Sequence, residues 1–237
     1  MMAPDCNVCG STRLIPRGEH GLLVCQDCRS RPVTRLLWLI LNARGLIAPG
    51  KRILHIAPEL GIAEQLRAIA GENYEPVDID PDAYADIAGV RRMDLCVEAP
   101  LLASGTYDLI IHSHVMEHVK CSAIAVMLHL HRALKDDGWQ VCCVPFVRNR
   151  HSSEDLAPID AEDALHRFGQ DDHVRVFGAL DIQQTLGMVF TLPGTYDLPG
   201  IFGAETLRRH AIPEVAWSGW TPHSVLALAK GDIRVGH

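Results

Sequence analysis

The chain has 237 residues, of which 48% are hydrophobic, and it carries a formal net charge of −7. That length suffices for one large α/β domain with a small appendage, and the apolar fraction supplies a substantial core. The negative charge argues against a protein that coats nucleic acid, because phosphate binding usually needs a basic face. No apolar run approaches the roughly 18 residues that suggest a membrane span, and no signal-peptide pattern is present, so we expect a cytoplasmic protein without membrane contact.

Four cysteines near the N-terminus form two C-x-x-C pairs, Cys6 with Cys9 and Cys25 with Cys28. Their spacing matches zinc sites in which two tight turns each supply two thiolates to one tetrahedral ion. A closed shell of four thiolates has no open position, so the sequence predicts a zinc ribbon over residues 1–32 with a structural Zn²⁺. The alternative, two redox or disulfide pairs, is disfavoured in the cytoplasm. Residues 33–50 contain a helical apolar pattern that would link the ribbon to the main domain.

The other four cysteines are expected to be small hydrophobic residues of the core, because they are scattered through apolar segments. They are Cys96, Cys121, Cys142 and Cys143.

From residue 51 onward, apolar strand patterns alternate with helical patterns, which predicts a doubly wound parallel sheet. The polar, turn-rich residues 147–172 are expected to be an insertion or a lid over the active site. The expected elements are strands at residues 53–57, 74–79, about 91–95, 107–113, 139–145 and 223–229, and a helix at about 122–135.

The first strand–loop–helix–strand unit indicates the ligand. The strand at residues 53–57 leads into a loop and a helix, and the following strand ends at Asp78. A carboxylate at that position can accept two hydrogen bonds from a ribose diol, which suggests an adenosine-containing cofactor. The G-x-G-x-x-G pattern is absent, which argues against a dinucleotide-dependent dehydrogenase.

Several segments together resemble the class I S-adenosylmethionine-dependent methyltransferases over residues 51–230. Their usual first loop has an acidic residue and a G-x-G-x-G pattern, whereas this chain has a His-x-Ala-Pro-Glu loop and keeps only Gly61. A subgroup of bacterial methyltransferases has such a loop and also a downstream signature similar to residues 168–178. The segments that carry the resemblance are ILHIAPE at 53–59, VDID at 77–80, RMDL at 92–95, YDLII at 107–111, HVMEH at 114–118, GW through VPF at 138–146, and FGQDDHVRVFG at 168–178.

The resemblance implies a Rossmann-like, doubly wound α/β fold with a mostly parallel seven-stranded sheet over residues 51–237. It also implies S-adenosylmethionine as the cofactor. Glu59 and Gly61 would line its methionine end, and Asp78 would hold the ribose hydroxyls. The other implied cofactor residues are Asp94 and Leu95 beside the adenine, Ser113 near the sulfonium, and His55, Ala57, Pro58 and Ile79 in the same two loops.

Methyl transfer requires alignment of a nucleophile with an activated methyl group, and an alcohol acceptor also requires a base. Neutral imidazoles suit that role near pH 7. His114, at the end of a strand, and His173 are the favoured catalytic residues, and a lid would bring Asp155 and Arg175 to the acceptor together with Arg167. We expect an oxygen, less readily a nitrogen, of a small-molecule or glycan-like acceptor. The full set of candidate bases is His114, His118, His151, His166 and His173.

Three alternatives remain open from the sequence. A metallo-hydrolase would use the cluster between His112 and His118, in which His114, Glu117 and His118 would share one helix face. An rRNA methyltransferase would use the ribbon to contact RNA, although the acidic composition opposes it. A non-catalytic binding protein would explain the loss of glycines from the first loop.

Overall fold

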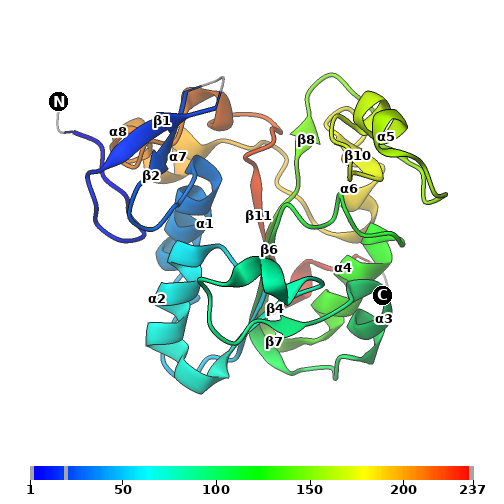
Figure 1. Ribbon diagram of the computed structural model, residues 1–237, viewed down its shortest axis with the longest axis horizontal. Coiled ribbons are helices and arrows are strands. Elements are labelled where there is room, and N and C mark those ends of the chain that lie inside the picture. The colour runs from blue at the N-terminus through cyan, green and yellow to red at the C-terminus, as the bar shows by residue number, and fades with distance from the viewer. Residues whose placement is uncertain (1–2, 19–20, 235–237) are drawn as a thin grey trace.

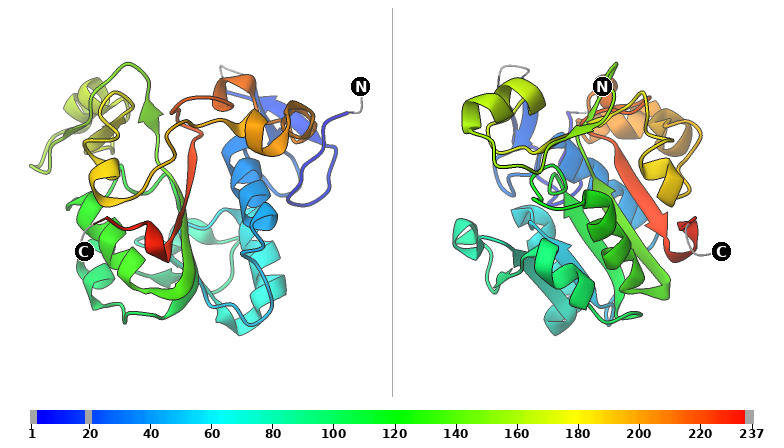
Figure 2. Two further views of the ribbon diagram at one scale, coloured as in Figure 1. Left: turned by 180° about the vertical axis from the view of Figure 1, so that it is seen from behind. Right: turned by 90° about the vertical axis from the view of Figure 1, so that its right-hand side faces the viewer.

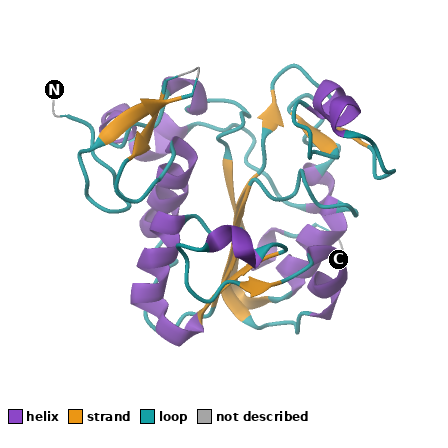
Figure 3. Ribbon diagram, in the orientation of Figure 1, coloured by secondary structure: helices purple, strands orange, loops and turns teal. Residues whose placement is uncertain are grey.

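A six-stranded sheet forms the centre of the computed structural model, which describes residues 3–18 and 21–234 (Figures 1 and 3). All neighbouring strands run parallel except the edge strand β11, which pairs antiparallel with β7. The strand order is β11-β7-β6-β3-β4-β5, with bounds β3 Ile53–Ile56, β4 Tyr74–Asp78, β5 Arg91–Arg92, β6 Tyr107–Ser113, β7 Leu134–Cys143 and β11 Val225–Ala229.

The sheet therefore has six strands in the described residues, and the expectation of seven was wrong. Between residues 179 and 224, where a further strand would lie, the chain forms short helices and loops. That region contains Pro193, Pro199 and Pro213, and proline cannot donate a hydrogen bond to a sheet ladder. The short helices are α6 Leu186–Val189, α7 Leu198–Phe202 and α8 Ala204–Arg209.

Helices cover both faces of the sheet, as Figure 2 shows. Successive residues of the buried strands contribute to different cores: Ile53 and Ile111 to one, Leu54 and Ile110 to the other. Helices α1 (Pro32–Ala43) and α2 (Leu60–Ala70) pack into the first core, and α4 (Ala123–Arg132) packs into the second. This arrangement confirms the predicted doubly wound fold, whose ligand sites lie at the carboxyl ends of the parallel strands.

The segment expected to be an insertion or a lid is a folded unit with its own small sheet. The sheet order is β8-β10-β9, and Ala164 and Phe168 of helix α5 pack against Val176. Helix α5 begins where the Asp160 side chain accepts a hydrogen bond from the Asp163 N–H, and it ends at the left-handed Gly169. Its bounds are Ala161–Phe168, and the strands are β8 Phe146–Val147, β9 Ser153–Glu154 and β10 Arg175–Gly178.

The N-terminal ribbon is a β-hairpin of β1 (Leu14–Arg17) and β2 (Leu22–Cys25) that shares a core with the main domain. In Figures 1 and 2 it lies beside α7 and α8. Asp5 makes 2.8 Å ion pairs with both Arg209 and His210, which belong to that C-terminal region. The ribbon is therefore anchored to the C-terminal region of the main domain.

The scattered cysteines divide into two kinds. Cys142 and Cys143 are buried in β7, as predicted. Cys96 and Cys121 are half-buried and joined by a disulfide, which corrects the expectation of free core thiols. Their Cα atoms lie 5.8 Å apart because helix α3 (Leu95–Glu98) packs beside the segment that follows β6. Among the described residues, no helix has the length and apolar character needed to cross a membrane.

Candidate active site

Two strained loops mark the carboxyl edge of the sheet, where the neighbouring strands β3 and β6 end. Ala57 follows β3 with φ of 52°, and His114 follows β6 with φ of 54°. Non-glycine residues rarely adopt this left-handed conformation, and such strain concentrates at functional sites. The two loops are adjacent because β3 and β6 are paired in parallel, with Ile56 opposite His112.

A cavity of about 510 Å³ opens at this edge and brings together four of the predicted cofactor residues: Asp78, Ile79, Asp94 and Leu95. Oδ1 of Asp78 accepts a hydrogen bond from the Asp80 N–H at 2.8 Å, and Oδ2 accepts one from the Tyr84 hydroxyl at 2.9 Å. Each carboxylate oxygen has a second lone pair, so both can accept a further bond. The cavity is large enough for a nucleoside-sized ligand.

His55 lies behind the first loop rather than in the cavity. It is fully buried, with Nδ1 2.9 Å from the Tyr74 hydroxyl and Nε2 2.9 Å from Oε2 of Glu59. The other carboxylate oxygen of Glu59, Oε1, is buried and has no hydrogen-bond partner among the described residues. The imidazole therefore orients a carboxylate that still has an unused acceptor, which is the group that a ligand's ammonium would satisfy.

Gly61, Pro58 and Ser113 are buried close to the same loops. The structure places Gly61 against the ribbon: a Cβ added there would lie 2.9 Å from the Cβ of Cys28. Gly61 therefore permits close approach between the first turn of α2 and a cysteine of the predicted zinc site.

His114 forms the centre of a polar cluster at the end of β6. Its Nδ1 lies 3.2 Å from Oε1 of Glu117, and its Nε2 lies 3.6 Å from Sγ of Cys143. Glu117 is only 1% exposed, whereas the His114 side chain is 37% exposed. Burial raises the pKa of the Cys143 thiol well above its ordinary value, and Glu117 and Glu59 raise it further. The thiol is therefore neutral and can donate to the imidazole.

His118 and His173 lie next to this pair, with ring centroids 4.7 Å apart. His118 is also 3.1 Å from Asp172 through Nδ1, and both of these residues line the 510 Å³ cavity. Burial lowers the pKa of His173, and the neighbouring His118 lowers it further. His173 is thus held neutral near pH 7. The structure brings the two predicted catalytic histidines, His114 and His173, into one cluster around Glu117.

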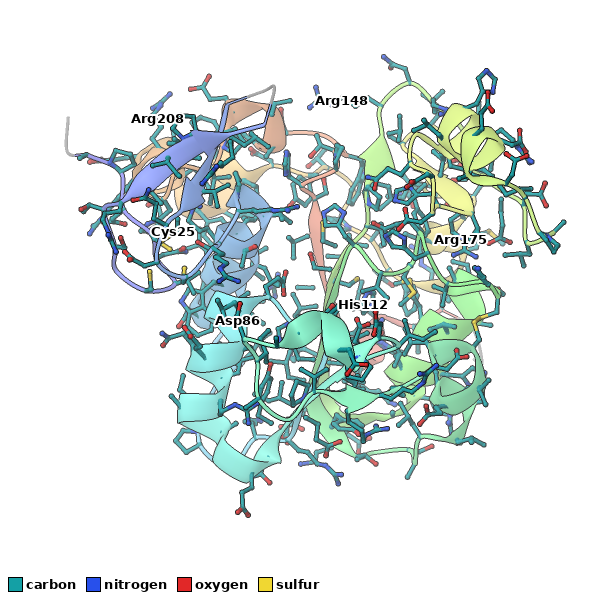
Figure 4. All side chains as sticks on the ribbon, in the orientation of Figure 1. Cys25, Asp86, His112, Arg148, Arg175 and Arg208 are labelled. Atoms are coloured by element: carbon teal, nitrogen blue, oxygen red, sulfur yellow. A yellow bond between two sulfur atoms is a disulfide. The ribbon has the colours of Figure 1, made fainter. Side chains whose placement is uncertain are left out.

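Arg175 and Asp155 have roles other than the predicted contact with the acceptor. The Arg175 guanidinium is 3% exposed and donates to Glu154 and to the carbonyl oxygens of Met116 and Cys121. Figure 4 shows Arg175 between the inserted unit and the main domain. It anchors the segment that carries Glu117 and His118. Asp155 forms a 2.7 Å ion pair with Arg167, which lowers its pKa.

The sequence did not single out His223 or Cys143 as site residues. Burial lowers the pKa of His223, as does the charge of His114 nearby, and its Nδ1 is buried without a partner among the described residues. The available signal was topological. An antiparallel edge strand begins at the edge where the parallel strands end, so His223, just before β11, arrives beside β6 and β7.

His112 belongs to a different environment from His114. It is fully buried in β6 with Nε2 2.9 Å from Nε2 of Gln140, and burial lowers its pKa to about 3 (Figure 4). The metal cluster considered between His112 and His118 therefore does not include His112.

The four ribbon cysteines gather in one cluster, with their sulfur atoms within 4.8 Å of one another. Cys6 lies 3.6 Å from Cys28, and Cys9 lies 3.6 Å from Cys25. A tetrahedral zinc ion with bonds of about 2.3 Å would separate its sulfur ligands by about 3.8 Å. The hydrogen bond from Cys28 lowers the pKa of Cys6, so one thiolate of the pair is favoured. The donor set and its spacing fit zinc.

A second cavity, of about 670 Å³, lies between α1, α7 and the outer strands. It is larger than the cavity at the carboxyl edge, but Arg44, Asp197 and Asp232 are its only charged lining residues. None of the predicted catalytic or cofactor residues reaches it. We therefore place the active site at the carboxyl edge of the sheet.

The fold and the carboxyl-edge cavity define a class I S-adenosylmethionine-dependent methyltransferase. The model of a methyltransferase domain family matches residues 30–187, two thirds of the chain, and the chain belongs to that family. The matched region excludes all four ribbon cysteines and includes the cavity and most of the polar cluster.

One solved structure supports the fold, and a second is reported for comparison. A candidate sarcosine dimethylglycine methyltransferase from Galdieria sulphuraria is similar, with 16% identity, a TM-score of 0.50, and coverage of 89% of this chain and 92% of that one. An S-adenosylmethionine-dependent methyltransferase from Mesorhizobium loti has 16% identity, a TM-score of 0.49, and coverage of 81% and 95%. A search of curated proteins found no similar sequence.

Proposed function

We propose that the protein methylates an oxygen of a small-molecule or glycan-like acceptor, with His114 as the general base. The observation that carries this proposal is the pairing of a partly exposed His114 with the buried Glu117, 3.2 Å away, at the strand end beside the cavity. S-adenosylmethionine supplies a methyl group activated by the adjacent sulfonium. Nitrogen remains a second acceptor type, and the cytoplasm remains the expected location.

The cofactor residues follow from the cavity and the loop behind it. Asp78 would accept hydrogen bonds from the ribose hydroxyls, and Asp94 and Leu95 would flank the adenine. Glu59 would accept a hydrogen bond from the cofactor's amino group. Two observations support this role: Oε1 of Glu59 is buried without a partner among the described residues, and Oε2 is held by His55. The left-handed backbone of Ala57 would bring the loop close to the cofactor in place of the missing glycines.

His114 would take the proton from an acceptor hydroxyl. A carboxylate that accepts from Nδ1–H holds the imidazole in the tautomer whose Nε2 carries the lone pair. That nitrogen would bind the proton in exchange for its weak contact with the Cys143 thiol. The same carboxylate stabilises the imidazolium once it forms. Only a neutral hydroxyl needs the base, so the loss of rate on removal of His114 would also indicate the class of acceptor.

The ribbon would hold a structural Zn²⁺ through Cys6, Cys9, Cys25 and Cys28. Binding of RNA is the second use of the ribbon, and affinity that falls steeply with salt would support it. A complete lack of cofactor binding would instead support the non-catalytic alternative.

The first experiment is calorimetric titration with S-adenosylhomocysteine. We expect micromolar binding to the wild type and a loss of at least tenfold in Asp78→Ala. Asp82→Ala, which removes an exposed carboxylate nearby, is the matched control and should bind normally. Equal affinity in all three proteins would refute the assignment of the ribose site.

The second experiment uses methyl-labelled S-adenosylmethionine with a panel of hydroxyl-bearing acceptors. For any acceptor that is methylated, His114→Ala should lower the rate by about 10²–10⁴-fold, the usual contribution of a general base. Its affinity for S-adenosylhomocysteine should change less than twofold. A full rate in His114→Ala would place the base elsewhere or show that none is needed.

A further inference from the structure

Glu117, His118 and His173 form a compact group of potential metal ligands beside the cofactor cavity. One ligand atom from each lies within 4.8 Å of the other two. Glu117 and His173 are buried, and His118 lines the cavity. The group is distinct from the ribbon cysteines and combines one carboxylate with two imidazoles.

Two features of these side chains favour a bound ion: an unpartnered carboxylate oxygen and a carboxylate that orients His118. Oε2 of Glu117 is buried and has no partner among the described residues, while Oε1 holds His114. Burying an unpaired carboxylate oxygen is costly unless a ligand completes its environment. Nδ1 of His118 faces Asp172 at 3.1 Å, which leaves Nε2 as the ligand nitrogen. An imidazole held by a second carboxylate in this way is typical of metal-ligating histidines.

The backbone fixes the two segments that supply these ligands. The Val174 N–H donates to the Glu117 carbonyl oxygen at 3.0 Å, directly beside His173. Arg175 donates to the carbonyl oxygens of Met116 and Cys121 on either side of Glu117 and His118. Ligands more than 50 residues apart in sequence are therefore held together before any ion binds.

We propose that Glu117, His118 and His173 bind a divalent cation of the zinc type at the acceptor side of the cofactor cavity. Two histidines and one glutamate form a ligand set that binds Zn²⁺ and leaves a position open for an oxygen donor. Tetrahedral bonds of about 2.1 Å would separate the ligand atoms by about 3.4 Å. These atoms lie within 4.8 Å of one another, so the side chains need to close by up to about 1.4 Å.

This proposal deepens the proposed function and rests on it for the identity of the ligand. The open position would take an oxygen of the methyl acceptor, so the acceptor class would be one with a hydroxyl or carboxylate next to the methylated atom. Oε1 of Glu117 would continue to orient His114 while Oε2 binds the ion.

The test is the zinc content of the full-length protein after dialysis against buffered Zn²⁺. We expect two ions per chain in the wild type, and one fewer in each of His118→Ala, His173→Ala and Glu117→Gln. His129→Ala, which removes a histidine from α4 outside the cluster, is the matched control and should match the wild type. Asp172→Asn should weaken binding of the second ion by about tenfold, as loss of a supporting carboxylate does.

Equal zinc content in the wild type and all three ligand variants would overturn the proposal, because no ion would then depend on the cluster. The difference of one ion is independent of how fully the ribbon site is filled. S-adenosylhomocysteine titration on the same samples separates the two proposals: normal binding without the zinc difference refutes only the metal site, and the zinc difference without cofactor binding refutes only the methyltransferase assignment.

Discussion

Replacement of Arg35 by methionine should destabilise the whole protein, although Arg35 lies far from the active site. Its guanidinium is fully buried and donates hydrogen bonds of 2.7–3.0 Å to the carbonyl oxygens of Leu23, Ser30, His210 and Ala211. Methionine keeps the apolar stem but leaves these carbonyls without their donor.

The size of the effect follows from those contacts. All four carbonyls lose a charged partner, but Ser30 keeps another donor in the Cys25 N–H, so three are left without a donor. Each buried group left unpaired costs about 1–3 kcal/mol, and part of the sum is offset because the charge need no longer be desolvated, which gives a net loss of about 3–5 kcal/mol. For a chain of this size, each kcal/mol lowers Tm by about 2–4 °C, so we expect a decrease of about 6–20 °C.

Urea and thermal unfolding of zinc-loaded protein would measure this change. Arg17→Met removes an exposed arginine from the same hairpin and should alter the free energy of unfolding by less than about 0.5 kcal/mol. Arg35→Lys should recover little, because an ammonium cannot span carbonyls on separate segments as a planar guanidinium does. A loss below about 1 kcal/mol in Arg35→Met would refute the reasoning.

Three further changes have directions that the structure determines. The depressed pKa of His112 means that only the unfolded chain binds a proton there between about pH 3 and the ordinary pKa of 6.5. The free energy of unfolding should therefore fall as pH decreases, by up to about 1.4 kcal/mol per pH unit. Urea unfolding between pH 4.5 and 7 should show a weaker dependence of this free energy on pH in His112→Leu than in the wild type, and equal dependence would contradict this. Gly61→Ala should cost about 1–3 kcal/mol and weaken zinc retention against a chelator, because its new methyl group would overlap Cys28; unchanged retention would contradict the close packing. Cys96→Ser should cost about 2–4 kcal/mol in oxidising buffer and almost nothing with a reductant, and a loss independent of reductant would show that the disulfide does not form.

The parts of the fold that local pattern determines were predicted well from the sequence. The continuous apolar run of β6 has the predicted bounds, Tyr107–Ser113, because only a central buried strand suits such a run. The start of β7 was placed five residues late, since Asp136, Asp137 and Gly138 read as a turn although they lie within the strand from Leu134. An insertion or a lid was predicted at residues 147–172, but its own sheet and helix were not, because its small core depends on contacts between residues distant in sequence.

The site could be predicted only in part, because some of its residues also depend on contacts between segments distant in sequence. Asp78 is the last residue of β4 and Asp94 lies two residues after β5, so strand-end geometry places both correctly at the cavity. Arg175 looked like an anion-binding residue because its polar neighbours gave no sign that it would be buried. His223 needed the antiparallel direction of β11, which no local pattern specifies.

The Arg35 hydrogen bonds also constrain how the chain matures during synthesis. The carbonyls of His210 and Ala211 lie 175 and 176 residues further along the chain than the guanidinium that binds them. Domains generally begin to fold from their N-terminal end as they emerge from the ribosome. Arg35 is therefore translated long before two of its four hydrogen-bond acceptors, which follow it by 175 and 176 residues. The packing around its guanidinium can be completed only after the segment that contains His210 and Ala211 has been made.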